Sequence, residues 1–293
     1  MTPLNVLLVV SLALTVLAYL GISRLRLVPP DNDPASYVLA HPDGAREKHL
    51  AVCAGDSITR GAVSANYVDL LAGRLPRWDF VNAGVNSELA FNLAGRLDQI
   101  IALDPDAVTI LIGTNDVNAT FGLRSALGYY AIQRFPERPN PLFFRENLTL
   151  VVRRLKRETR ARIALFSIPP IGEASDHYAY LRTEEYSTII REVAESEEVD
   201  YLPLRERLVE YLESLPASPH APPFRRFGTI GRRAIRARIL LGRSLDEISA
   251  SNGFRLLVDG IHLNTHGAAI AAALAEAFIC ECTSYCEPYA ATE

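Results

Sequence analysis

Apolar and polar residues alternate along this chain with two different periods, which predict strands and helices in turn. Five short apolar runs are bounded by glycine, proline or polar residues, as expected for strands buried inside a parallel sheet. These predicted strands are residues 49–54, 80–83, 107–112, 162–168 and 199–202. Apolar residues spaced three or four apart predict amphipathic helices around them. The predicted helices are residues 66–75, beginning near Ser64, and 89–103, 144–159, 180–196 and 265–279.

This alternation predicts an α/β fold, a three-layer α/β/α sandwich around a parallel sheet. Residues 205–255 depart from it, because a helix, a Pro-rich hinge and two further helical stretches at 229–241 and 245–251 follow one another without a strand. We interpret this segment as a helical insertion. The predicted domain spans residues 49–293.

An apolar segment without charged residues, 4–22, precedes the domain. A helix needs about 20 such residues to cross a bilayer. No Lys or Arg precedes the segment, and a small-x-small cleavage site is missing, which favours an uncleaved anchor over a signal peptide. We predict a single-pass membrane protein with a transmembrane anchor in residues 1–26 and a linker in 27–48. Arg24 and Arg26 alone leave the side of the membrane open.

The amino-acid composition excludes some classes of function. The chain has 30 basic and 34 acidic residues, which fits a globular protein and argues against general nucleic-acid binding. The charge is uneven, however, since Pro216 to Arg243 holds seven arginines and no acidic residue. Cys280, Cys282 and Cys286 lack a fourth ligand at zinc spacing, so no metal site is predicted there.

A polar turn after the first predicted strand holds the first candidate catalytic residue. Gly55-Asp56-Ser57 ends the strand beside a helix start, at the edge where α/β sheets present reactive groups. We interpret Ser57 as a nucleophile, which requires a base, a group that orients the base, and donors for an oxyanion. Asp56 is interpreted as a structural turn residue.

The segment Asp259-Gly260-Ile261-His262 contains the candidate base. A carboxylate three residues before an imidazole can fold back to one ring N–H, which leaves the other ring nitrogen to take a proton from a serine. Alone, the pattern also fits a turn residue and a histidine near a helix start. His266 fits a helix position better.

Two other strand ends carry candidate oxyanion donors. The side-chain amide of Asn115 follows the strand 107–112, and the backbone N–H of Gly84 ends the strand 80–83. Losing one such donor costs roughly 3 kcal/mol of transition-state stabilisation. Taken singly, Asn115 also fits a turn former, Asp116 a cap, and Gly84 a tight turn with positive φ.

Together, four motifs in chain order resemble those of the SGNH hydrolases, also called GDSL-type esterases and lipases. They are Gly55-Asp56-Ser57-Ile58, Asn82-Ala83-Gly84, Gly113-Thr114-Asn115-Asp116 and Asp259-Gly260-Ile261-His262. The similarity extends from about residue 49 to 279, with Ile58 where the family often has Leu. It implies a flavodoxin-like sandwich with a five-stranded parallel sheet, and catalysis without a metal or cofactor.

The resemblance also implies a role for each matching residue. Ser57 would be the nucleophile, His262 the general base and Asp259 the group that orients it. The backbone N–H groups of Ser57 and Gly84 and the Asn115 side chain would form the oxyanion hole. A nucleotide-binding module is disfavoured, because the first loop lacks Gly-x-Gly-x-x-Gly and a Walker lysine.

These residues predict a serine ester hydrolase acting through an acyl-serine intermediate on lipid or other acyl esters near a membrane. The predicted anchor and the basic, amphipathic segment 229–241 favour lipid, although that segment also fits a helix packed on the domain. The predicted partners are a small-molecule or lipid ester and a membrane. The alternatives are an O-deacetylase of cell-envelope polysaccharide and a non-catalytic binding or scaffold protein of the same fold.

Overall fold

The computed structural model describes residues 28–216 and 230–281, and its centre is a five-stranded parallel sheet. The strand order β2-β1-β3-β4-β5 is the flavodoxin-like order. All five strands lie where the apolar runs predict them. They are β1 (His49–Gly55), β2 (Trp78–Gly84), β3 (Ala107–Leu111), β4 (Arg162–Phe166) and β5 (Asp200–Leu202).

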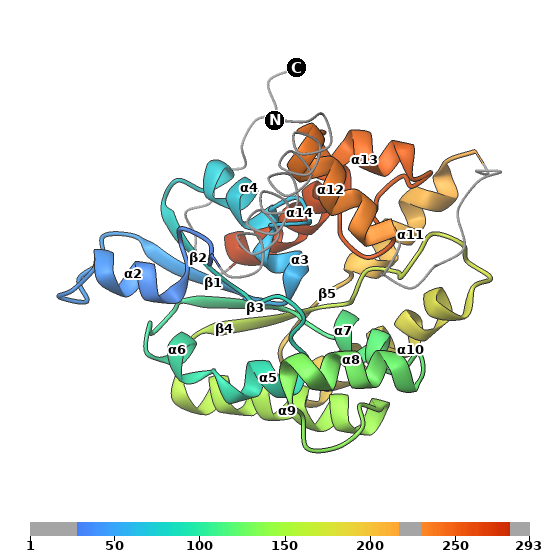
Figure 1. Cartoon of the computed structure of the whole chain (residues 1–293). Helices are drawn as coiled ribbons and strands as arrows, with labels where there is room; N and C mark the ends of the chain where they lie inside the picture. Colours follow the sequence, from blue (N-terminus) through green and yellow to red (C-terminus); the bar gives the residue numbers. More distant parts are fainter. Residues whose placement is uncertain (1–27, 217–229, 282–293) are drawn as a thin grey trace, which may run out of the picture.

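Helices cover both faces of the sheet, as the predicted sandwich requires (Figure 1). The upper layer in Figure 1 contains α3 (Ser57–Arg60), α4 (Tyr67–Arg74), α11 (Leu204–Ser214), α12 (Ile230–Leu241), α13 (Leu245–Ser251) and α14 (Thr265–Glu281). The lower layer contains α5 (Ala90–Gly95), α6 (Asp98–Ile101), α7 (Thr114–Ala119), α8 (Leu123–Gln133), α9 (Pro141–Glu158) and α10 (Tyr178–Ser196). The central strands β1 and β3 are thereby buried on both faces.

Two helices differ from their predicted limits for local reasons. Helix α4 is capped by Asn66, whose side chain accepts from Val68 N, whereas Ser64 instead exchanges hydrogen bonds with the backbone of Leu263. The predicted helix 89–103 is divided into α5 and α6. Between them Arg96 turns its guanidinium onto Glu88 and the carbonyl oxygens at the ends of β1 and β2.

Part of the predicted linker 27–48 is folded and bound to the domain. It contains α2 (Pro34–Ala40), which begins with an Asp33 cap and a proline in its first turn. Just before α2, Asn32 donates to the carbonyl oxygen of Phe80 and accepts from the backbone N–H of Asn82. β2 is an edge strand of the sheet, and these bonds cover its open side, which protects it from pairing with another chain.

The prediction of a single-pass membrane protein is corrected. Among residues 28–216 and 230–281, no helix is long and apolar enough to cross a bilayer. The longest, α9 and α10 with 18 and 19 residues, carry charged side chains along their length. The apolar segment 4–22 and the whole predicted anchor 1–26 lie outside the described residues.

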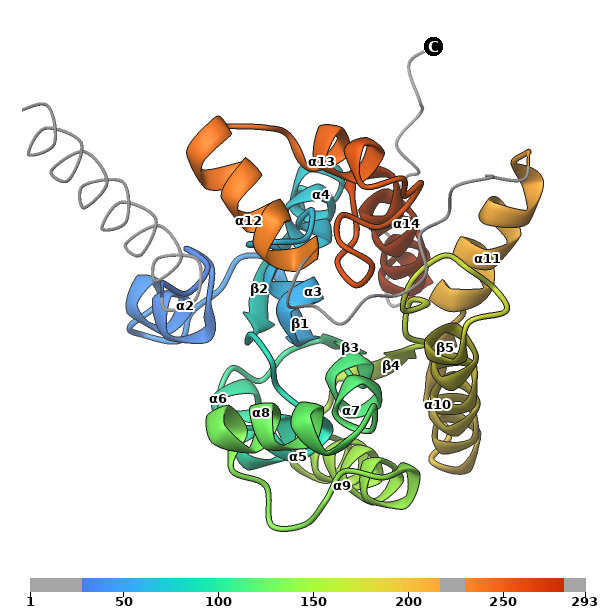
Figure 2. The ribbon, with the colours of Figure 1, turned by 45° about the vertical axis from the view of Figure 1, so that its right-hand side comes forward.

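The predicted insertion 205–255 contains α11, α12 and α13. Helix α11 packs on α14, and α12 packs on α13 (Figure 2). In both views α12 and α13 lie on the same side of the sheet as α4 and α14. Cys282 and Cys286 of the predicted cysteine group lie outside the described part of the chain.

The substitution Gly84→Ala tests how closely α3 is packed on the sheet. A Cβ at this position would lie 2.7 Å from Arg60 Cα and closer still to its backbone nitrogen, so neither side could relax without moving α3. We expect Gly84→Ala to lower the free energy of unfolding by about 3 kcal/mol or more, measured by urea denaturation. Gly73→Ala in α4 is the matched control, since nothing lies within 4 Å of its Cβ, and it should stabilise the protein by up to about 1 kcal/mol. Equal stability of Gly84→Ala and the wild type would contradict this packing.

Candidate active site

Loops at the carboxyl ends of the parallel strands bring the predicted site residues together. Ser57 is the first residue of α3, directly after β1, and Asp56 caps that helix by accepting from Ile58 N. Asn115 lies in α7 directly after β3. Asp259 and His262 lie in a turn closed by an antiparallel bridge between Leu257 and Leu263. Because β1 and β3 are neighbouring parallel strands, their carboxyl ends place Ser57 and Asn115 on one edge of the sheet. The turn with Asp259 and His262 follows α13 rather than a strand, and it brings His262 to Ser57 from 205 positions away.

Ser57, His262 and Asp259 form a continuous hydrogen-bonded chain. Ser57 Oγ lies 2.9 Å from His262 Nε2, and His262 Nδ1 lies 2.8 Å from Asp259 Oδ2. An ionised carboxylate can only accept, so the imidazole proton is on Nδ1 and Nε2 accepts from the serine hydroxyl. This is the tautomer that a general base for Ser57 requires.

Burial and charge fit this arrangement. The exposed fractions of Ser57, His262 and Asp259 are 9, 4 and 2 %. Burial lowers the pKa of His262, but the charge and hydrogen bond of Asp259 outweigh it, and the pKa is raised above its usual 6.5. For Asp259, burial raises the pKa, but His262 and two backbone N–H donors lower it by more than burial raises it. The pKa of Asp259 therefore lies below its usual value. The carboxylate is therefore ionised beside the imidazole.

The turn that carries Asp259 and His262 is held by its own backbone. Asp259 Oδ1 accepts from the N–H groups of Ile261 (3.1 Å) and His262 (3.0 Å). Gly260 between them has φ 93°, a conformation that favours glycine. The Val258 N–H donates to the His262 carbonyl oxygen at 2.7 Å. The short Asp-x-x-His spacing thus holds in place both the Asp259 carboxylate and the His262 backbone, and with them the contact between the carboxylate and the ring.

Glu173 holds the same turn from outside, and the sequence analysis missed it. Its carboxylate, in the loop after β4, accepts from the backbone N–H groups of Arg255 (2.8 Å), Leu256 (2.8 Å) and Leu257 (3.0 Å). The neighbouring Gly172 donates to the Gly260 carbonyl oxygen at 2.7 Å. Nothing in the sequence marks Glu173, because its partners are backbone groups more than 80 positions away.

Asn115 is held in one amide orientation by its neighbours. The Asn118 amide donates to the Tyr129 hydroxyl at 2.9 Å, so the single hydroxyl proton of Tyr129 points to Asn115 Oδ1 at 2.7 Å. Asn115 Nδ2 then donates to Asp56 Oδ2 (3.1 Å) and to the Glu88 carbonyl oxygen (3.0 Å). Tyr129 therefore orients a predicted site residue.

Gly84 is placed beside the site, but its backbone N–H is already used. It donates to Asn82 Oδ1 at 3.0 Å, so this bond would have to break before the N–H could donate to an oxyanion. The close contact with Arg60 explains the glycine instead. In the same loop Ser87 has a left-handed φ of 63°, and its N–H donates to no other described residue.

Two carboxyl groups near the site are buried without a salt bridge to another described residue. Burial raises the pKa of Asp56 to about 7 and that of Asp116 to about 8. Asp116 accepts from the Ala90 N–H, and Asp56 caps α3. Both carboxyl groups therefore hold backbone segments of the site in place. This agrees with the interpretation of Asp56 as a structural turn residue. In the described part of the chain, no group of three or more His, Cys, Asp or Glu residues is arranged to hold a metal.

Comparison with known proteins agrees with the motifs and the fold. Residues 53–270, well over half of the chain, match the model of the GDSL-like Lipase/Acylhydrolase family. No curated protein sequence matches the chain.

Solved structures similar to this one include esterases. An acetylxylan esterase from Geobacillus stearothermophilus is 19 % identical, with a TM-score of 0.56, covering 81 % of this chain and 96 % of that one. A lipase/acylhydrolase from Enterococcus faecalis is 21 % identical, with a TM-score of 0.54, covering 83 % and 100 %. The acetyl xylan esterase AlAXEase is 19 % identical, with a TM-score of 0.54, covering 78 % and 99 %. At this identity the likeness concerns the fold alone.

The Tyr129 hydroxyl can be tested through ester hydrolysis. In Tyr129→Phe the Asn115 amide loses the bond that fixes its orientation, while the ring and its packing remain. We expect kcat to fall about tenfold, the value of one hydrogen bond, with KM nearly unchanged. Tyr178→Phe is the matched control, since that side chain on α10 is 54 % exposed. Equal kcat values for the two variants would show that the orientation of Asn115 does not depend on Tyr129.

Proposed function

Because this chain belongs to the GDSL-like lipase/acylhydrolase family, we propose that it cleaves its substrate through a covalent acyl intermediate on Ser57. The chain is a carboxylic ester hydrolase. The observation that carries the proposal is the buried chain of hydrogen bonds from Ser57 Oγ through His262 to Asp259, at 2.9 and 2.8 Å. The same three residue types in the same contacts perform acyl transfer on unrelated folds.

In the proposed mechanism, Ser57 Oγ attacks the ester carbonyl carbon while His262 Nε2 takes the hydroxyl proton. Asp259 stabilises the imidazolium that forms. The tetrahedral intermediate collapses as His262 returns the proton to the leaving alkoxide oxygen, which departs as the alcohol. Water, deprotonated by His262, then attacks the carbonyl carbon of acyl-Ser57. The bond from this carbon to Ser57 Oγ breaks, Oγ takes the proton back from His262, and the carboxylic acid is released.

The oxyanion needs donors already held near the place where its charge develops. We propose the backbone N–H of Ser57 and Asn115 Nδ2, whose two hydrogens rest on Asp56 Oδ2 and the Glu88 carbonyl oxygen in the free enzyme, so that one of these bonds gives way to the oxyanion. For the backbone donor from the loop after β2, we propose Ser87 in place of Gly84. Its N–H has no acceptor among the described residues, and the next residue, Glu88, contacts Asn115 through its carbonyl oxygen.

We propose that the substrate is an ester with an apolar acyl group. Helix α8 exposes Leu123, Leu127 and Tyr130 by 65, 56 and 52 %, and these residues lie on one helix face. Large apolar side chains gathered on a surface often form a binding site. The same helix provides Tyr129, which contacts Asn115, so this apolar surface is connected to the proposed oxyanion hole.

A second candidate is hydrolysis of acetyl esters on a carbohydrate. It is favoured by two of the structural neighbours, which are acetylxylan esterases. A panel of esters of one alcohol with acetyl, butyryl and octanoyl groups distinguishes the candidates. Higher kcat/KM for octanoyl supports the apolar acyl ester, and a preference for acetyl supports the carbohydrate ester.

A fluorophosphonate probe tests the proposed nucleophile. The wild type should be labelled on Ser57, and Ser57→Ala should lose both labelling and hydrolysis, by roughly 10^4-fold or more. Ser214→Ala, at an exposed serine of α11, is the control and should behave as the wild type. A folded wild-type protein that stays unlabelled would rule out the proposal.

The pH dependence of hydrolysis tests the proposed base. Because the pKa of His262 is raised above 6.5, the ring keeps its proton to a higher pH than a free histidine. We expect kcat/KM to be low in acid and to rise through a midpoint above 6.5. Asp259→Asn removes the charge that raises this pKa, so the midpoint should move down and kcat should fall by roughly 10^3-fold or more. An unchanged profile in Asp259→Asn would exclude this role for Asp259.

A further inference from the structure

The described end of the basic segment, residues 230–243, contains α12 and the start of the connection to α13. The whole chain has a net charge of -4, yet Pro216 to Arg243 contains no acidic residue. Four of its arginines have described side chains: Arg233, Arg236 and Arg238 on α12, and Arg243 just after it. A positive surface on a protein of negative net charge favours encounters with anions.

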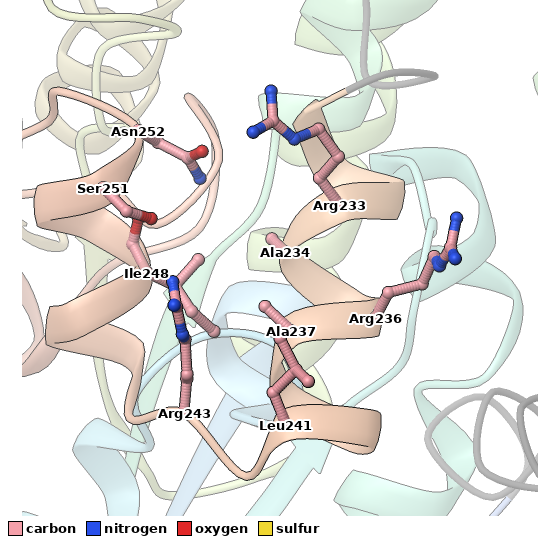
Figure 3. A pocket seen from close by; sticks show the side chains of 9 residues that line it. All are labelled: Arg233, Ala234, Arg236, Ala237, Leu241, Arg243, Ile248, Ser251 and Asn252. Carbon is pink, nitrogen blue, oxygen red and sulfur yellow. The ribbon is translucent and has the colours of Figure 1, made fainter.

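A cavity of about 330 Å³ lies between α12 and α13 within this surface (Figure 3). Its apolar wall consists of Ala234, Ala237, Leu241 and Ile248. Figure 3 shows Arg243 directed between the two helices and Arg233 on the α12 side facing Asn252, whereas Arg236 points away from α13. The groove therefore combines an apolar wall with two guanidinium groups at its rim.

No carboxylate in the described part of the chain lies within ion-pair distance of Arg233 or Arg243, although the charge of Arg243 acts on Glu247. The nearest acidic residues on α13 are engaged elsewhere: Asp246 accepts from the Thr265 N–H, and Glu247 accepts from the N–H and hydroxyl of Ser244. Hydrogen bonds from Ser244, and then the charge of Arg243, keep the pKa of Glu247 below its usual range. The donors of both guanidinium groups thus remain available to a ligand.

The groove is built on the segment that leads into Asp259. Ala234, Ile248 and Val258 form a small buried cluster. Asn252, which lines the groove, donates to the Val258 carbonyl oxygen at 2.8 Å. Val258 in turn donates to the His262 carbonyl oxygen. The floor of the groove is therefore ordered together with the His262 turn, while neither Ser57 nor His262 lines the cavity.

We propose that the groove between α12 and α13 binds a small organic anion, with a carboxylate or phosphate head on the arginines and a short apolar body against the wall. Guanidinium groups bind planar carboxylates and phosphates through paired N–H donors. The volume is within the range of small-ligand sites, which are mostly apolar with a few polar groups. The proposal does not depend on Ser57 being the nucleophile.

Isothermal titration calorimetry at low salt with octyl phosphate and octanoate, below their micelle concentrations, tests this site. The wild type should show saturable binding. The double variant Arg233→Gln/Arg243→Gln should bind at least about tenfold more weakly, as expected for the loss of charged hydrogen bonds. Arg207→Gln is the matched control, since this exposed arginine of α11 does not line the cavity, and it should bind like the wild type. Tighter binding of octyl phosphate or of octanoate identifies the head group, and either result supports the site.

Several results would overturn the proposal. Binding that is absent in the wild type, or equal in the double variant and the wild type, would exclude the two arginines. Binding lost in Ser57→Ala would place the ligand at the catalytic serine instead. Inorganic phosphate binding as tightly as octyl phosphate would remove the role of the apolar wall. Thermal unfolding of every variant verifies that the substitutions at these exposed positions leave the fold intact.

Discussion

Helix α3 lies against the carboxyl ends of β1 and β2, and it can do so because both strands end in glycine. A side chain at Gly55 would collide with Thr59 and the Leu111 carbonyl oxygen, and one at Gly84 with the backbone of Arg60. This close approach sets the position of Ser57, the first residue of α3. The Asp56 side chain that caps the helix also reaches Asn115. Packing at two glycines therefore fixes the Ser57 hydroxyl relative to the next strand end.

The second half of the site needs support from outside, because its turn is far from Ser57 in the sequence and buries a carboxylate. Burying an ion is unfavourable unless hydrogen bonds and an opposite charge compensate. Asp259 receives both from Ile261 and His262. Glu173 and Asn252 hold the segment just before the turn, from the loop after β4 and from the insertion. The insertion thereby contributes to the geometry of the proposed triad without supplying a member of it.

The hydrogen-bond partners of Asn115 fix the orientation of its side-chain amide. A side-chain amide can point either way, and only its partners decide which end faces a ligand. Here the order of donors from Asn118 through Tyr129 fixes the oxygen, which leaves the nitrogen toward Asp56 and Glu88. Buried networks of this kind are rigid when every member is satisfied. An orientation held in advance is what oxyanion stabilisation requires.

The sequence by itself determined the strands, most of the helices and the residues Ser57, Asn115, Asp259 and His262, since apolar periodicity and short motifs are local properties. It could not assign the cap of α4, the break at Arg96 or the docking of residues before β1, which depend on partners distant in the chain. It could not show that the Gly84 N–H binds Asn82, because spacing does not reveal this contact. The roles of Glu173 and Tyr129 became clear only from the tertiary structure, because hydrogen bonds between loops distant in the chain produce no pattern in the sequence.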